Sequence, residues 1–110
     1  MKMFDFQSYY LYFHSANSGA MDVRAHITVC GLVQGVGFRY FVLNQAERFG
    51  LNGFVRNLFD GGVEIVVEGD RSIVEEFIKS VKTGPRLARV TDLMIDWQKP
   101  EQQFHEFTIR

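Results

Sequence analysis

Two helical hydrophobic patterns, each set between strand-like patterns, constrain the fold of this chain more than any other feature. Apolar and polar residues alternate over residues 24–30, and Val63, Ile65 and Val67 alternate with polar residues later in the chain. Alternation with a period of two is typical of a strand with one buried face. Between these strands a group of apolar side chains recurs at helical spacing: Phe38, Phe41, Val42, Ala46 and Phe49.

Turn residues separate these patterns into distinct elements. Asp-Gly-Gly at residues 60–62 lies between the strand-like runs 52–57 and 63–68, and such a sequence predicts a β-hairpin. Gly50 is expected to end the first helix in a left-handed conformation, which glycine adopts more readily than other residues.

A second helix is expected over residues 72–82. Ser72 and Glu75 have the spacing of a capping box, and Gly84 followed by proline is expected to end the helix. Its predicted buried stripe is Ile73, Val74, Phe77, Ile78 and Val81.

Two final strands are predicted over residues 90–97 and 104–110. The predicted order is therefore βαββαβ plus a final strand, with short connections. This order indicates an α+β protein, a ferredoxin-like sandwich in which an antiparallel sheet carries two helices on one face.

The first 21 residues differ from the rest. Six of the sixteen aromatic residues fall between Phe4 and Phe13 with no helical or strand period, and residues 15–20 resemble a linker. We expect residues 1–21 to be an N-terminal extension that is poorly ordered, and residues 22–110 to form one domain. The alternative is an arm whose exposed aromatic side chains bind a neighbouring subunit.

Composition narrows the class of protein. Twelve Lys and Arg residues against thirteen Asp and Glu residues give a net charge of −1, so no basic field favours nucleic acid. The one cysteine, Cys30, excludes an internal disulfide and a cysteine-based zinc site, and it favours a cytoplasmic location. No apolar run reaches the roughly 18 residues that a membrane helix needs, so no membrane partner is expected.

The segment 31–39, GLVQGVGFR, has the composition of an anion-binding loop. Gly35 and Gly37 permit unusual backbone geometry and close approach of a ligand, and the loop leads directly into a helix N-terminus. Arg39 lies where its planar guanidinium can hold two phosphate oxygens. The segment does not complete the G-x-G-x-x-G motif of dinucleotide-binding loops, because Tyr40 stands where the third glycine belongs. From these residues alone, a purely structural turn therefore remains an alternative.

Residues 29–39, VCGLVQGVGFR, resemble the first signature of the acylphosphatase family. Residues 53–57, GFVRN, followed by GGV at 61–63 and by Gly69, resemble its second signature. The resemblance covers residues 24–110 and implies a free-standing acylphosphatase with a ferredoxin-like fold. Such enzymes hydrolyse the carboxyl–phosphate bond of acyl phosphates such as acetyl phosphate, carbamoyl phosphate and bisphosphoglycerate, with no metal or organic cofactor.

The resemblance also implies roles for individual residues. Arg39 corresponds to the phosphate-binding arginine of the family, and Asn57 to the asparagine that positions the attacking water. Two positions depart from the pattern: Leu58 replaces a Thr or Ser found in many animal members, and Phe59 replaces a proline frequent in bacterial members. The resemblance further implies that backbone N–H groups of the loop hold the phosphate. These groups belong to Gln34, Gly35, Val36, Gly37 and Phe38. Inorganic phosphate or sulfate would compete with the substrate for this site.

The chemistry needs few groups, because a carboxylate of pKa about 4.3 leaves without a proton. The remaining needs are stabilisation of phosphoryl charge and placement of water. Cys30, His26 and His105 are interpreted as structural residues of the strands, and Glu64 and Glu68 as solvated residues on a polar strand face.

Three other functions remain open at this stage. RNA-recognition modules share the ferredoxin-like plan, but the aromatic run 36–42 lies at a loop-to-helix junction instead of on a central strand. A regulatory or transfer role is possible as in the front domain of hydrogenase-maturation carbamoyltransferases, although no zinc-finger cysteines follow. An inactive anion-binding relative is the third alternative.

Overall fold

The computed structural model describes residues 22–110, and the expectations for residues 1–21 lie outside the described residues. The order of elements over this range is the predicted one. They are β1 (Asp22–Leu32), α2 (Phe38–Arg48), β2 (Asn52–Asn57), β3 (Val63–Asp70), α3 (Arg71–Thr83), β4 (Arg89–Gln98) and β5 (Phe107–Ile109).

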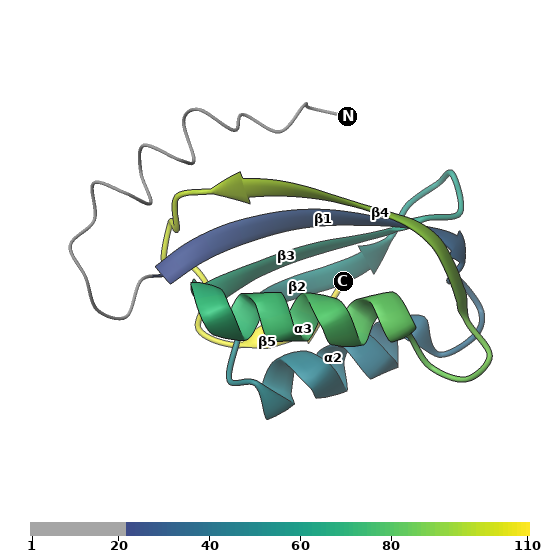
Figure 1. The fold of residues 1–110 in the computed structure, drawn as a ribbon, viewed down its shortest axis with the longest axis horizontal. Coiled ribbons are helices and arrows are strands. Elements are labelled where there is room, and N and C mark those ends of the chain that lie inside the picture. Colours follow the sequence, from purple (N-terminus) through teal and green to yellow (C-terminus); the bar gives the residue numbers. More distant parts are fainter. Residues whose placement is uncertain (1–21) are drawn as a thin grey trace.

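The strands form one sheet in the order β4-β1-β3-β2-β5, and both helices lie on the same face of it (Figure 1). The first four strands pair antiparallel, as expected. The predicted α+β, ferredoxin-like fold is thereby confirmed. The last strand differs in direction and length: β5 runs parallel to β2 and pairs through Phe107, Thr108 and Ile109.

The hydrophobic core fills the space between the helices and the sheet. Ala25, Ile27 and Val29 are completely buried, which confirms the strand alternation predicted for β1. From the helices, the core receives the side chains of Phe38, Val42, Ala46, Val74, Phe77, Ile78 and Val81. The prediction for Ile73 was wrong, because its side chain is 39% exposed at the edge of the helical stripe.

The start of α3 also differs from the capping box that the sequence suggested. Asp70, the last residue of β3, is the N-cap, and its Oδ1 accepts a hydrogen bond of 3.0 Å from the backbone N–H of Ser72. Ser72 is thus already inside the helix. Aspartate is as good an N-cap as serine, and here it lets α3 begin directly where the strand ends.

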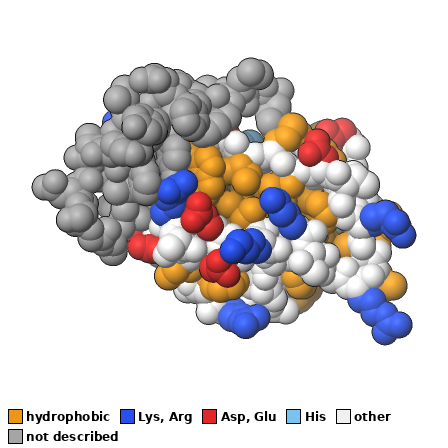
Figure 2. All heavy atoms as spheres, viewed as in Figure 1, with side chains coloured by type: hydrophobic (Ala, Val, Ile, Leu, Met, Phe, Trp, Pro, Cys, Tyr) orange, Lys and Arg blue, Asp and Glu red, His pale blue; other side chains and the backbone are white. Residues whose placement is uncertain are grey.

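The surface seen in Figure 2 carries charges of both signs around a central group of hydrophobic side chains. No large area of this face has a single sign of charge. Neither α2 nor α3, the helices of the described range, is long and apolar enough to cross a membrane.

Candidate active site

The loop between β1 and α2 exposes the N-terminus of the helix. Gly35 and Gly37 have φ angles of 75° and 77°, in the left-handed region where other residues are strained. Gly37 is the N-cap of α2, and no side chain forms a capping hydrogen bond there. The first N–H groups of a helix have no partner within the helix, and the helix dipole makes this end positive. The loop therefore presents hydrogen-bond donors that suit an anion.

A cavity of about 170 Å³ opens at this helix end. Three separate parts of the chain form it: the glycine loop with the first turn of α2, the end of β2, and β5. The residues that line it are Val33, Gly35, Gly37, Phe38, Arg39, Tyr40, Asn57 and Ile109.

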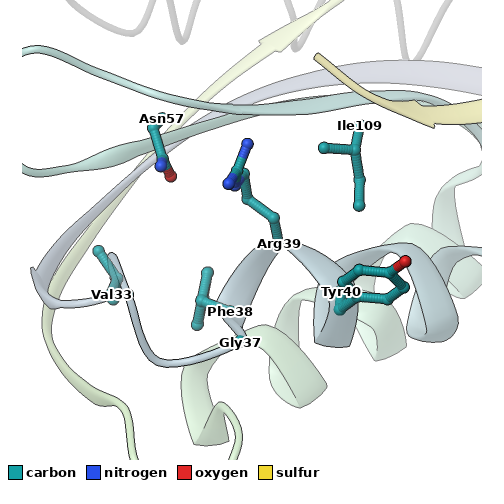
Figure 3. A pocket seen from close by; sticks show the side chains of 8 residues that line it. Val33, Gly37, Phe38, Arg39, Tyr40, Asn57 and Ile109 are labelled. Atoms are coloured by element: carbon teal, nitrogen blue, oxygen red, sulfur yellow. The ribbon is translucent and has the colours of Figure 1, made fainter.

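Arg39 and Asn57 face each other across this cavity (Figure 3). The Arg39 side chain extends from α2 toward the sheet, and its guanidinium points toward the amide of Asn57 at the end of β2. Arg39 is half-buried, yet within residues 22–110 its guanidinium has no hydrogen bond, ion pair or aromatic contact. A partly buried cation without a counter-ion, beside a helix N-terminus, makes an electropositive cavity.

The side chain of Gln34 is not part of the lining of this cavity. Its Nε2 donates hydrogen bonds to the backbone carbonyls of Leu58 at 2.7 Å and of Gly62 at 2.8 Å. These two bonds tie the glycine loop to the hairpin that follows Asn57. Gln34 therefore holds the glycine loop, which is one half of the site, close to the hairpin beside Asn57, which is the other half.

A second, more open cleft of about 490 Å³ adjoins the cavity on the hairpin side. Asn57 contributes to both, so the two hollows meet at its side chain. The second cleft is lined by Gln34, Arg56, Asn57, Leu58 and Phe59.

Arg56, next to Asn57, is paired on the other face of the sheet. Its Nε donates to Glu64, whose other oxygen lies 2.7 Å from Nε2 of His26. Burial raises the pKa of the Glu64 carboxyl, but the hydrogen bonds from His26 and Arg56 outweigh it and the pKa ends below its usual value. Arg56 and Glu64 are therefore paired with each other outside the cavity. Among the described residues that line the cavity, Arg39 is the one charged residue.

The structure thus brings Gly35, Gly37, Phe38, Arg39 and Asn57 together around one cavity. Gln34 and Val36 lie outside its lining, and Val36 packs against the core instead. Cys30 is a free thiol outside the lining. No group of three metal-ligating side chains occurs within the described range.

The sequence interpretation did not single out three uncharged residues of the lining: Val33, Tyr40 and Ile109. Tyr40 follows Arg39 directly, and its position in the first helical turn was the available signal. No local pattern pointed to Ile109, because β5 reaches the cavity only through its parallel pairing with β2.

The fold, with a glycine loop at a helix N-terminus and an arginine facing an asparagine across a cavity, defines a small α+β domain, and comparison with known proteins identifies it further. The acylphosphatase family model matches residues 25–109. An acylphosphatase of Thermococcus kodakarensis is 51% identical over 79 residues, which cover 72% of this chain and 87% of that protein.

Solved structures agree. A crystal structure of acylphosphatase from Bacillus subtilis superposes with a TM-score of 0.78 at 40% identity, covering 80% of this chain and 98% of that one. The crystal structure of HypF from T. kodakarensis also matches, with a TM-score of 0.69 and 40% identity, over 78% of this chain and 11% of that much longer one.

The chain belongs to the acylphosphatase family. Its identification as an acylphosphatase, a hydrolase with a ferredoxin-like fold, is confirmed by these relatives.

Proposed function

We propose that the cavity hydrolyses the carboxyl–phosphate bond of small acyl phosphates by direct attack of water on phosphorus. One observation carries the proposal: the guanidinium of Arg39, which has no partner among residues 22–110, lies in a cavity beside a helix N-terminus and faces the amide of Asn57. The phosphoryl group is bound by the N–H groups of residues 34–38 and by Arg39, whose planar fork suits two phosphate oxygens.

Asn57 positions the water. Its amide oxygen accepts a hydrogen bond from the attacking water, while its NH₂ group donates to a phosphoryl oxygen. A new P–O bond forms from the water oxygen, and the bond from phosphorus to the bridging oxygen breaks. Its electron pair leaves on the carboxylate, and the proton lost by water ends on inorganic phosphate.

Among the described residues that line it, the cavity has no histidine, carboxylic acid, lysine or cysteine. None is needed for the leaving group, because a carboxylate departs as a stable anion. Arg39 and the loop N–H groups stabilise the charge that develops on the phosphoryl oxygens. The proposed mechanism therefore uses placement and electrostatics, without a metal or an organic cofactor.

The ligands of this site are small molecules, so inorganic phosphate and sulfate compete with substrate, and neither nucleic acid nor a membrane is a partner. We place the reaction in the cytoplasm, on the argument that a single free thiol suits a reducing compartment.

Steady-state hydrolysis of benzoyl phosphate in the presence of EDTA tests the proposal, with phenyl phosphate as an ester control. We expect turnover of the acyl phosphate alone, with inorganic phosphate acting as a competitive inhibitor. Arg39→Lys keeps the charge but loses the paired donors, so kcat/KM should fall at least about tenfold. The proposal fails if benzoyl phosphate is not hydrolysed, or if EDTA abolishes turnover.

A further inference from the structure

The direction in which the acyl group leaves follows from the positions of Arg39 and Asn57. In phosphoryl transfer the attacking and leaving oxygens lie roughly in line through phosphorus. With water held at Asn57 and the phosphoryl group held by Arg39 and the loop, the bridging oxygen must lie on the side of phosphorus away from Asn57.

That side of the cavity is formed by Tyr40 and Ile109. In Figure 3 Arg39 lies between Asn57 at one end of the cavity and these two residues at the other. Tyr40 projects from the first turn of α2, directly after the phosphate-binding arginine, and Ile109 reaches the cavity from β5.

Apart from the Tyr40 hydroxyl, the side chains at this end are apolar. Tyr40 leaves 70% of its side chain exposed, which provides an aromatic surface that the protein's own core does not use. Ile109 is partly buried against the core, and neither residue brings a charge to the lining. An aromatic ring packs well against another aromatic or apolar group, and the Tyr40 hydroxyl is the one polar side-chain atom that these two residues bring; neither supplies a cation to pair with an anionic acyl group.

We propose that Tyr40, with Ile109 beside it, forms the acyl-binding subsite and makes the enzyme prefer acyl phosphates with an aromatic or other apolar acyl group. This inference rests on the proposed function, since it takes the positions of water and phosphate from it. Tyr40 is a specificity-determining residue here, and it takes no part in the bond changes.

A second exposed aromatic residue supplies a matched control. Phe59 lies in the adjoining cleft on the Asn57 side and is fully exposed. The in-line argument places the entering water on that side, so Phe59 should not contact the acyl group. Both aromatic residues are exposed at the surface, and truncation of either leaves the core intact.

The experiment measures kcat/KM for benzoyl phosphate and for acetyl phosphate in the full chain and in Tyr40→Ala, Tyr40→Phe and Phe59→Ala. We expect Tyr40→Ala to lower the benzoyl-to-acetyl ratio of kcat/KM roughly fivefold, within the range that one aromatic contact contributes. Tyr40→Phe, which keeps the ring, should restore the ratio, and Phe59→Ala should leave it unchanged. The inhibition constant of inorganic phosphate, which has no acyl group, should not change in Tyr40→Ala.

An unchanged ratio in Tyr40→Ala overturns the inference, as does an equal loss for both substrates. A ratio that falls in Phe59→Ala instead shows that the acyl group leaves on the Asn57 side. Failure of the proposed function is distinct from these outcomes, because the unaltered chain would then hydrolyse neither substrate.

Discussion

Removal of the Gln34 side chain tests whether the two halves of the site are held together as the structure indicates. Gln34→Ala deletes the two hydrogen bonds to the carbonyls of Leu58 and Gly62, at 2.7 and 2.8 Å. A neutral hydrogen bond contributes about 0.5–1.5 kcal/mol net, so the pair contributes about 1–3 kcal/mol to the free energy of unfolding. For a domain of this size the melting temperature should fall by about 5–15 °C.

The same substitution should affect catalysis in a particular way. The hairpin that follows Asn57 loses its tie to the glycine loop, and displacement of a positioned group by about 1 Å can cost about 100-fold in rate. We therefore expect a loss of about ten- to 100-fold in kcat. Phosphate binding should change little, because the backbone N–H groups of the loop and Arg39 remain.

Three measurements check this prediction: thermal unfolding, steady-state kinetics below the melting temperature, and inhibition by inorganic phosphate. Gln45→Ala is a suitable control, since Gln45 accepts one hydrogen bond of 2.9 Å from Ser80 between the two helices, outside the cavity lining. It should lose some stability while keeping kcat. The reasoning is refuted if Gln34→Ala retains full stability and kcat, or if it weakens phosphate binding with kcat intact.

Four further predictions follow from the site and its surroundings. Asn57→Ala should lower kcat far more than it changes the inhibition constant of phosphate; a raised KM with an unchanged kcat would reverse the assignment. The kcat of the intact chain should be nearly constant between about pH 5.5 and 8, and a step removed by replacing His26 or His105 would contradict this. The folded state lowers the pKa of Glu64 below its ordinary 4.5, so its contribution to stability is present above that value and is lost as pH falls through the lowered pKa. Urea unfolding at about pH 7 and 3 should therefore show that the free energy of unfolding falls less on acidification in Glu64→Gln than in the unaltered chain. Deletion of residues 1–21 should leave melting temperature and kcat/KM nearly unchanged, because the described core lies within residues 23–107; a large loss of either would show that the extension packs on the domain.

The sequence predicted those parts of the fold that depend on local patterns. Alternation in β1 and β3 and the apolar spacing of both helices follow from periods of two and 3.6, which the core requires. Gly50, which has a φ of 69°, ends α2 as expected, and the glycine loop leads into the helix as its composition indicated.

Features that depend on choices between similar residues, or on distant contacts, were not predictable in the same way. Asp70 and Ser72 are both good N-caps, and in the structure β3 ends at Asp70, which is the cap. Ile73 fits the helical stripe by spacing, but it is exposed, and the buried stripe begins at Val74.

The residues of the candidate site likewise differ in whether a local sequence pattern identifies them. The residues contributed by the loop and the first turn of α2 share one short segment, so a motif can identify them. The position of Asn57 across from Arg39 came from a family resemblance, and its spatial basis is the antiparallel hairpin. Ile109 escaped prediction because a three-residue strand carries little signal of its own.

The parallel pairing of β5 with β2 has a consequence for how the cavity forms during synthesis. The cavity walls come from residues 33–40, from Asn57 and from Ile109, so their contacts span much of the chain. Contacts between residues so far apart in sequence form late, because closing the intervening loop costs entropy first. In a nascent chain that has not yet exposed residues 107–109, β2, which carries Asn57, pairs with β3 alone and leaves its other edge open. The complete cavity, with its wall at Ile109, should therefore form only after residues 107–109 have left the ribosome, later than the phosphate loop itself.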